Sequence, residues 1–317
     1  MPAIYAKAPG KIILFGEHAV VYAQPAIAIP VNKVYATTRV IPEVAGRKNQ
    51  VHIKAPDIQL DVDLADLDEE HPFAVTIQQV LNAVNLDHLP SLTLLISSTI
   101  PIAAGMGSSA AIAIATIRAL TDFLGKPLTA GEISSLAFEV EKIHHGTPSG
   151  IDNYVIAHQK PVFFTHGKPI EHLEIQQPTH WVIADTGEKT STKDTVAAVR
   201  KLQALDPETY HPIFEQIGEI AFTARQALIT GNIDLLGQLM GDNQRLLEQL
   251  TVSSPKLDKL ISAALTAGAV GAKLSGGGRG GNMIALAPTQ NTQSIESALL
   301  EAGATRVITT TLNKGET

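Results

Sequence analysis

The segment Pro101–Ala111, with the sequence PIAAGMGSSAA, places glycines and hydroxyl groups where a strand-like run leads into an apolar helix. A helix start leaves backbone N–H groups without intrahelical partners and carries the positive end of the helix dipole, so it attracts anions. Gly105 and Gly107 let the backbone approach a ligand closely, while Ser108 and Ser109 can cap the helix or bind a phosphate-bound Mg²⁺. We expect a phosphate site here, and an ordinary serine N-cap after a flexible turn is the alternative.

A second segment, Ala8–Tyr22, has the sequence APGKIILFGEHAVVY and carries polar side chains at both ends of an apolar run. Lys11 precedes the run, and Glu17 and His18 follow it. In a pocket, the Lys11 ammonium can stabilise charge that develops on a hydroxyl or phosphoryl oxygen. On the surface, where most lysines lie, it would have no such role.

The third segment, Lys273–Ala285, has the sequence KLSGGGRGGNMIA and formally contains the pattern G-x-G-x-x-G. A dinucleotide-binding loop needs a helix directly after its glycines, whereas Met283–Leu286 continues as an apolar, strand-like run. Protein kinases place such a loop between strands near the N-terminus, but their H-R-D and D-F-G motifs are missing from this chain. The pattern G-x-x-x-x-G-K-[ST] is missing too, which excludes a Walker-type P-loop enzyme.

Two carboxylates flank the loop Gly146–Gly150, which has the sequence GTPSG. Glu141 precedes it in an expected helix, and Asp152 follows it. The loop can turn the chain so that both carboxylates face one pocket, although an Asp just after a glycine can also serve only as a helix cap. Phosphoryl transfer depends on alignment and charge balance, so a dipolar loop, a metal ion and a lysine together favour that chemistry.

The elements that must position these groups can be predicted from periodicity. In the first half, we expect one or two strands in Ala26–Ile41, a strand in Ser91–Ile100, and helices in Ala110–Leu124 and Thr129–His144. Thr129 and Glu132 have the spacing of a capping box at the start of the second helix.

In the second half of the chain, the sequence pattern predicts strands and helices in the order β, α, β, β, α, β. The expected elements are a strand at 181–185, several helices between 192 and 267, strands at 272–275 and 282–287, a helix at 292–302 and a strand at 306–312. This order is the split βαβ pattern of a ferredoxin-like domain with extra helices in the first crossover. A composition shift at Gly167–Pro169 marks the expected boundary, which gives domains at 1–167 and 168–317.

Composition narrows the class of ligand. The chain has 317 residues, of which 44% are hydrophobic and 17% charged, a net charge of -7, and no cysteine. This profile is typical of a globular protein, argues against binding to nucleic acid or an anionic membrane, and excludes disulfides and thiolate sites. No secretory pattern is present, because Lys7 and Lys11 interrupt the N-terminal run, so we expect a cytoplasmic protein with a small-molecule ligand.

Taken together, the three segments resemble the GHMP kinase family, which is named for galactokinase, homoserine kinase, mevalonate kinase and phosphomevalonate kinase. Within it, GEHAVVY at 16–22 and HGTPSGIDN at 145–153 are most similar to the mevalonate kinases. The resemblance implies an α+β, two-domain fold with a ribosomal-protein-S5-like N-terminal domain and a ferredoxin-like C-terminal domain. It also implies ATP-dependent phosphorylation of mevalonate to 5-phosphomevalonate in isoprenoid synthesis, with both substrates in the cleft between the domains.

The resemblance assigns roles to individual residues. It implies that Asp152 takes the proton from the acceptor hydroxyl beside Lys11, and that Glu141, Ser108 and Ser109 hold Mg²⁺. The residues implied to bind the ATP phosphates are Pro101, Ala104, Gly105, Met106, Gly107, Ser108, Ser109 and Ala110. Those implied to line the acceptor side are Glu17, His18, Thr192, Gly276 and Gly277.

The third segment departs from the family pattern. Where relatives tend to have small residues and often a Cys, this chain has Arg279 and Asn282, so their effect on nucleotide binding stays open. Two other functions remain open as well: phosphomevalonate kinase or another GHMP kinase with a different acceptor, and a non-catalytic binding protein on the same fold. The family also suggests a homodimer.

Overall fold

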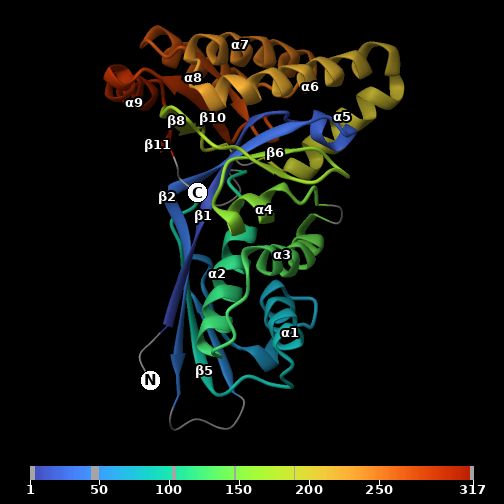
Figure 1. Cartoon of the computed structure of the whole chain (residues 1–317), viewed down its shortest axis with the longest axis vertical. Coiled ribbons are helices and arrows are strands. Elements are labelled where there is room, and N and C mark those ends of the chain that lie inside the picture. The colour runs from blue at the N-terminus through green and yellow to red at the C-terminus, as the bar shows by residue number, and fades with distance from the viewer. Residues whose placement is uncertain (1–3, 44–49, 102–104, 146–147, 189, 315–317) are drawn as a thin grey trace. The chain divides into compact units, whose positions relative to one another are not determined.

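The computed structural model describes residues 4–43, 50–101, 105–145, 148–188 and 190–314 (Figure 1). The chain forms two compact units that are interleaved along the sequence. The first unit contains residues 1–11, 34–101 and 107–159, and the second contains residues 12–33, 102–106 and 160–317. The division into domains at residues 167 and 168 remains a prediction, because the units are defined by packing and are not separated by one cut in the chain.

The first unit is built on a mixed sheet with helices on one side. Strand β2 (Ala26–Pro42) pairs with β1 (Ile4–Phe15) and, in antiparallel fashion, with β5 (Leu92–Ser98). Strand β3 (Val51–Ala55) is parallel to β5 and antiparallel to β4 (Leu60–Asp63). The outer part of β2 and all of β3 and β5 alternate buried and more exposed positions, as expected for strands covered on one face.

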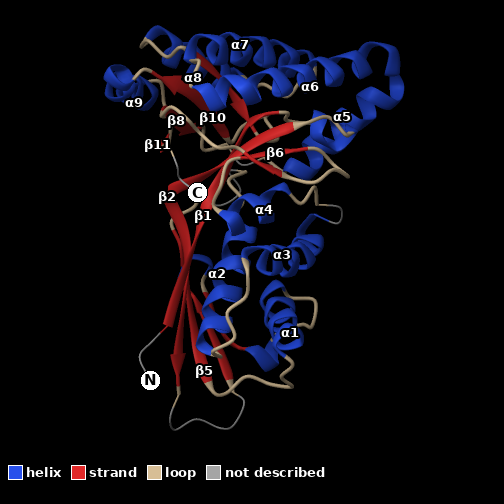
Figure 2. Cartoon of the chain, viewed as in Figure 1, coloured by secondary structure: helices blue, strands red, loops and turns tan. Residues whose placement is uncertain are grey.

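Four helices cover that face in Figure 2: α1 (Pro72–Val84), α2 (Ser108–Phe123), α3 (Ala130–His145) and α4 (Ile151–His158). Helix α2 lies among the other three and is rich in Ala, Ile and Thr, which lets neighbouring helices approach closely. Its buried residues include Ala111, Ile114, Ala115 and Ile117. The residue types of α2 therefore fix where its N-terminus and the start of α4 lie in this unit.

The second unit contains a four-stranded antiparallel sheet in the order β11 (Arg306–Leu312), β8 (Thr179–Asp185), β10 (Asn282–Ala287), β9 (Gly271–Ser275). Its helices are α5 (Thr192–Leu205), α6 (Pro207–Thr230), α7 (Ile233–Gln249), α8 (Pro255–Thr266) and α9 (Thr292–Glu301). Strands β6 (Val162–Phe164) and β7 (Glu171–His172) also belong to this unit, and β6 pairs with the first residues of β2. The expected order β, α, β, β, α, β and the ferredoxin-like fold are confirmed.

Most of the predicted elements are present. The Thr129–Glu132 capping box is formed, since the Thr129 N–H donates to the Glu132 carboxylate at 2.8 Å and the Glu132 N–H donates to the Thr129 hydroxyl at 3.3 Å. Ala26–Pro42 forms one strand and not two. The short strands β3 and β4 and the helix α1 were not predicted. Among the described residues, no helix combines the length and the apolar character that crossing a bilayer requires.

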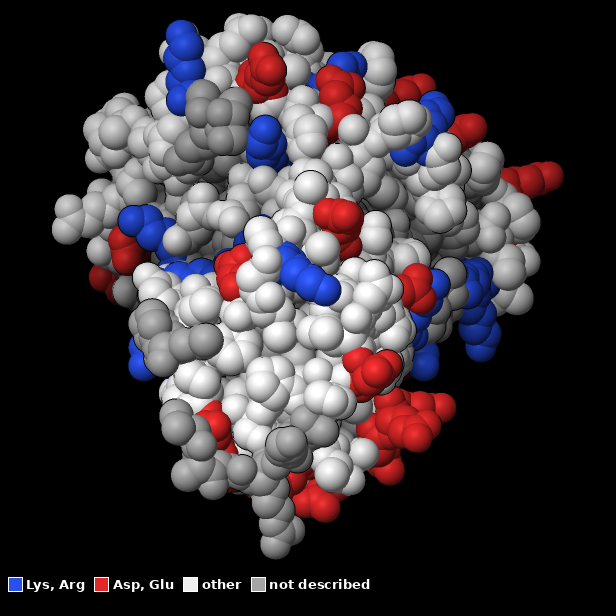
Figure 3. All heavy atoms as spheres, turned by 60° about the horizontal axis from the view of Figure 1, so that its bottom comes forward, with Lys and Arg blue, Asp and Glu red and all other residues white. Residues whose placement is uncertain are grey.

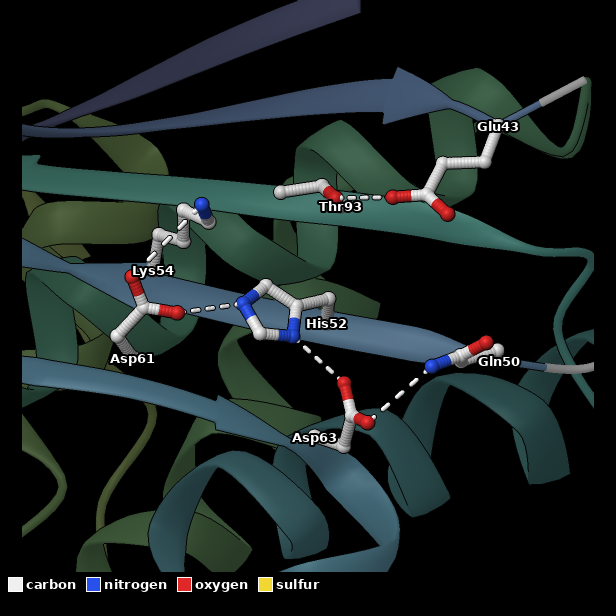
Figure 4. A network of polar contacts seen from close by, with 7 residues as sticks. All are labelled: Glu43, Gln50, His52, Lys54, Asp61, Asp63 and Thr93. Carbon is white, nitrogen blue, oxygen red and sulfur yellow. Dashed lines mark hydrogen bonds and ion pairs between the residues drawn. The ribbon is translucent and has the colours of Figure 1, made fainter. Parts of the chain in front are cut away.

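The outer face of β3 and β4 carries a polar network (Figure 4). His52 lies at its centre, with Nδ1 2.6 Å from Asp63 Oδ1 and Nε2 2.6 Å from Asp61 Oδ1. An ionised carboxylate can only accept, so the ring binds both aspartates fully when both of its nitrogens are protonated, and these hydrogen bonds raise the pKa of His52. The two aspartates thus favour the charged form of His52.

Charges on one face of the molecule are mostly scattered, apart from a group of acidic side chains at the lower right of Figure 3. Among the side chains drawn as described, the basic ones on this face form no continuous stripe.

Candidate active site

An ion pair joins β1 to the start of α4 in the first unit. Lys11 Nζ lies 2.9 Å from Asp152 Oδ1, and the two residues are far apart in the sequence. The Lys11 side chain is 5% exposed and the Asp152 side chain 28% exposed, so the carboxylate remains open to solvent on one side. Asp152 lies in the first turn of α4, after Gly150, where the helix dipole favours a negative charge. The expected neighbourhood of these two side chains is present.

The start of α2 packs against this pair through Gly107. Gly107 is the N-cap of α2 and has a φ of +70°, which side-chain-bearing residues rarely adopt. A Cβ atom here would lie 2.8 Å from Ile156 Cδ1 and 3.1 Å from Lys11 Cγ. Glycine avoids both the strained φ and these contacts, and it has no side chain to cap the free N–H groups of the first turn. The alternative of an ordinary serine N-cap is therefore wrong, because Ser108 and Ser109 lie inside the helix.

A second carboxylate lies near the same helix start. Ser109 Oγ donates a hydrogen bond of 2.6 Å to Glu141 Oε1, and Glu141, on α3, is only 2% exposed. Carboxylate and hydroxyl oxygens are the ligand types that Mg²⁺ accepts, so this pair fits the ion. No cluster of three or more His, Asp or Glu side chains suited to a metal occurs in the described part of the chain. An ion at this place would depend on phosphate oxygens and water for its other ligands.

The other predicted phosphate-binding residues differ in their exposure. Gly105 has open space around its Cα, Met106 and Ala110 are buried, and Pro101 is partly exposed. Ala104 lies outside the described residues. Within this segment, Gly107 at the start of α2 is thus the residue that lies next to Lys11.

In the second unit, His18 contacts the third segment. Its Nε2 lies 3.0 Å from the Gly277 carbonyl oxygen, which can only accept, so Nε2 carries the proton. Burial lowers the pKa of His18 to about 4, the hydrogen bond to Gly277 opposes this shift, and the Arg279 charge adds to it. The ring is therefore neutral at pH 7, and Nδ1, which has no hydrogen-bond partner among the described residues, offers a lone pair.

Glu17 makes a fully buried ion pair with Lys273 on β9. Its other carboxylate oxygen accepts from Asn243 Nδ2 on α7 at 3.3 Å, and Lys273 Nζ also donates to the Leu274 carbonyl at 2.7 Å. Burial lowers the pKa of Lys273, and the charge of Glu17 opposes that shift. The structure thus directs both oxygens of Glu17 toward protein partners.

Sequence reasoning missed two members of this cluster, Lys273 and Asn243. A signal for Lys273 does exist, because it occupies the middle of β9, in which every position is buried. A charged residue in such a strand requires a partner. Asn243 gave no signal beyond its place on the inner side of an amphipathic helix.

The glycine loop between β9 and β10 borders a small hollow together with Gly105, Thr190 and Thr192. A Cβ atom on Gly277 would lie 3.2 to 3.3 Å from atoms of Thr192, so these two predicted residues are close neighbours. Gly276 is the first residue of this loop but does not line the hollow. The predicted acceptor-side residues of the second unit are therefore grouped around one loop.

The two departures from the family pattern have different surroundings. Arg279 has a φ of +58°, and its guanidinium donates to the carbonyl and the hydroxyl of Thr251 at 3.2 and 3.4 Å. That side chain is engaged just beyond the C-terminal end of α7. Asn282 is 2% exposed, begins β10 and lines the hollow beside the glycines.

Comparison with known proteins assigns the family. Residues 73–160 match the model for the GHMP kinases N terminal domain, and residues 224–305 match the model for the GHMP kinases C terminal domain. A mevalonate kinase from Thermococcus gammatolerans is 37% identical over 98% of this chain and 97% of its own length, and one from Pyrococcus furiosus is also 37% identical with the same coverage.

Among solved structures, the L. major mevalonate kinase in complex with R-mevalonate matches with a TM-score of 0.82 and 29% identity. The match covers 99% of this chain and 97% of that one. The sequence, both family models and the fold all indicate the same family. The chain belongs to the GHMP kinase family.

Proposed function

We propose that this chain is an ATP-dependent kinase that phosphorylates the primary hydroxyl of mevalonate to give 5-phosphomevalonate in isoprenoid synthesis. The observation that carries the proposal is the Lys11–Asp152 pair, held at 2.9 Å beside the glycine that begins α2. The names of the full-length relatives support the choice of mevalonate as the acceptor.

Asp152 would take the proton of the acceptor hydroxyl as the O–P bond forms. Its carboxylate is suited to this role because it is held beside Lys11 and one side is open to a reactant. Lys11 would hold Asp152 in place and stabilise negative charge on the attacking oxygen or the transferred phosphoryl group. Phosphoryl transfer depends mainly on the alignment of the reacting oxygens and on stabilisation of the phosphoryl charge, and little on covalent catalysis by the protein.

The first turn of α2 would bind the ATP phosphates through its free N–H groups. Glu141, Ser108 and Ser109 would hold Mg²⁺, which supplies positive charge to the phosphate oxygens when it is bound. The hydrogen bond between Ser109 and Glu141 keeps two candidate oxygen ligands together on α2 and α3.

Acceptor binding would involve His18, Glu17, Thr192, Gly276 and Gly277. The lone pair on His18 Nδ1 is suited to accept from a hydroxyl group, while Glu17 would act mainly by holding the backbone of its own segment near β9. A cytoplasmic location and a homodimer are part of the proposal. Size-exclusion chromatography with light scattering tests the dimer, and subcellular fractionation tests the location.

A panel of acceptors tests the proposed activity. ATP consumption is measured with mevalonate, phosphomevalonate, homoserine and galactose, each with Mg²⁺ and with a chelator. We expect turnover with mevalonate that depends on Mg²⁺. A preference for phosphomevalonate would overturn the choice of acceptor, and no turnover with any acceptor would favour a binding protein on the same fold.

A further inference from the structure

Arg118 joins the two elements that carry the Lys11–Asp152 pair. It lies on α2, and its guanidinium donates from Nη1 to the Lys7 carbonyl at 3.0 Å and from Nη2 to the Ala157 carbonyl at 2.5 Å. Lys7 belongs to β1, and Ala157 lies in the last turn of α4. The Arg118 side chain on α2 thus connects strand β1 with helix α4.

Both carbonyl acceptors lie close along the chain to the reacting side chains. Lys7 is four residues before Lys11 on β1, and Ala157 is five residues after Asp152 on α4. Helix α4 has only eight residues, and its C-terminal turn carries the carbonyl that accepts from Arg118. A shift of its C-terminal turn would move the carboxylate at its N-terminal end.

We propose that Arg118 is a positioning residue for phosphoryl transfer, which keeps Asp152 within hydrogen-bond distance of Lys11 by holding β1 and α4 in one arrangement. The proposal rests on the proposed function for its kinetic consequence but not for its structural one. A displacement of about 1 Å at a reacting group can lower turnover by roughly 10².

The guanidinium group is suited to this role because it is planar and presents several donors in fixed directions. A lysine at the same position would have a single nitrogen on a flexible chain, which satisfies one carbonyl more easily than two. The Arg118 side chain is also partly buried, and burial lowers its pKa while Asp122 opposes that shift. Removing the side chain leaves the partly buried Ala157 carbonyl without this donor.

A purely stabilising role for Arg118 is the competing explanation, and the chain offers a matched control. Lys126 donates from Nζ to the Val84 carbonyl at the last residue of α1. This contact has the same chemistry, but α1 carries none of the proposed site residues. Lys126→Met therefore removes a cation from a helix C-terminus without affecting β1 or α4.

Steady-state kinetics of the full chain distinguish the two explanations. We expect Arg118→Met to lower kcat about tenfold or more with little change in the KM for either substrate, since alignment and not binding is lost. The kcat of Arg118→Lys should lie between those of Arg118→Met and the wild type. If Arg118→Met does not fold, Arg118→Lys takes its place in the comparison. Lys126→Met should match the wild type. Equal kcat values for Arg118→Met and Lys126→Met would overturn the proposal.

The Asp152→Asn background gives a sharper comparison. If Arg118 acts through the placement of Asp152, adding Arg118→Met to Asp152→Asn should lower the residual turnover much less than it does in the wild type. The same fold-change in both backgrounds would show that Arg118 acts on the molecule in general, and would overturn the positioning role.

Hydrogen exchange keeps this inference separate from the proposed function. In Arg118→Met, we expect the amides of 151–158 to exchange faster than in Lys126→Met, because α4 has lost its tie to β1. If the wild type is inactive with every acceptor, the proposed function fails while this measurement still decides the role of Arg118. Unchanged exchange in α4 would overturn it.

Discussion

The Lys11–Asp152 and Lys273–Glu17 pairs have the same chemistry in different surroundings. Lys11 and Asp152 lie 2.9 Å apart with 28% of the Asp152 side chain exposed, whereas Lys273 and Glu17 are both fully buried. The first carboxylate has a side open to a reactant. The second has its oxygens bonded to Lys273 and Asn243.

Access to solvent, and not the charge pair itself, would let one carboxylate react with a bound molecule while the other acts only in the packing of the protein. A buried pair has lost its hydration, so removing one partner leaves an uncompensated charge in the interior. A partly exposed pair is cheaper to break but can exchange protons with a bound molecule. We therefore expect opposite outcomes when each carboxylate is neutralised.

Glu17→Gln should have the largest effect on stability. It leaves Lys273 buried without its counter-ion, and we expect the free energy of unfolding to fall by about 3–5 kcal/mol. Urea denaturation measures the loss. The matched control is Glu139→Gln, which breaks the exposed Glu139–Lys142 pair and should change stability by less than about 0.5 kcal/mol.

A loss in Glu17→Gln no larger than in Glu139→Gln would mean that burial adds nothing to this ion pair. The double variant Glu17→Gln with Lys273→Met sharpens the result. It removes the unpaired charge, so it should recover part of the lost stability.

Asp152→Asn should have the largest effect on turnover. We expect kcat to fall by a factor of roughly 10² or more, because the proposed base is lost, while ATP binding stays close to that of the wild type. The free energy of unfolding should fall by less than in Glu17→Gln, because a polar amide remains beside Lys11 and the pair is partly open to solvent. Asp242→Asn, on the exposed Asp242–Arg245 pair, is the control for a surface carboxylate. Near-normal turnover in Asp152→Asn would remove that residue from its proposed role.

Gly107→Ala should lower both stability and turnover, because the new methyl group meets Ile156 and Lys11. The positive φ alone costs about 1–2 kcal/mol for an alanine. Gly125→Ala is the control that separates the effect of φ from the effect of the contacts. Gly125 has a φ of +68°, but an added Cβ would have no atom within 4 Å. Equal kcat values for the two variants would show that the close approach to Lys11 does not matter for catalysis.

The smallest expected effect is the pH dependence of the His52 network in Figure 4. Hydrogen bonds to Asp63 and Asp61 raise the pKa of His52 in the folded state. The stabilisation is therefore fully present below the unfolded pKa of about 6.5 and is lost as the pH rises through the folded value. The difference in unfolding free energy between wild type and His52→Gln should be larger near about pH 6 than near about pH 9.

The control for this prediction is the same substitution in a chain with Asp61→Asn and Asp63→Asn. There, His52→Gln should lose its pH dependence, because the carboxylates that raise the pKa are gone. If the effect of His52→Gln still depends on pH in the chain with both aspartates replaced, the two carboxylates are not the cause of that pH dependence.

Elements with a strong period or a clear boundary signal were predictable. The helix at Thr129 followed from its capping box, and the second half of the chain followed from the alternation of strands and helices. Strand β3 and strand β4 are short, and β3 becomes a strand through its parallel pairing with β5. Such long-range pairing leaves little trace in a sequence window.

The candidate site was predictable to a similar degree. The glycine–serine segment and the family resemblance brought Lys11, Asp152, Ser109 and Glu141 to attention, and the structure places them as two bonded pairs in one unit. The partner of Glu17 was not found, because residues 256 positions apart were joined by packing and not by a local pattern. Arg118 was missed for the same reason, since its acceptors are backbone carbonyls that no residue type reveals.

The interleaving of the two units has a consequence for biosynthesis. During translation, Glu17 leaves the ribosome 256 residues before its partner Lys273. Until then the carboxylate remains hydrated, because burying it alone would be unfavourable. Residues 12–33 can therefore complete their packing in the second unit only after β9, which carries Lys273, has been synthesised.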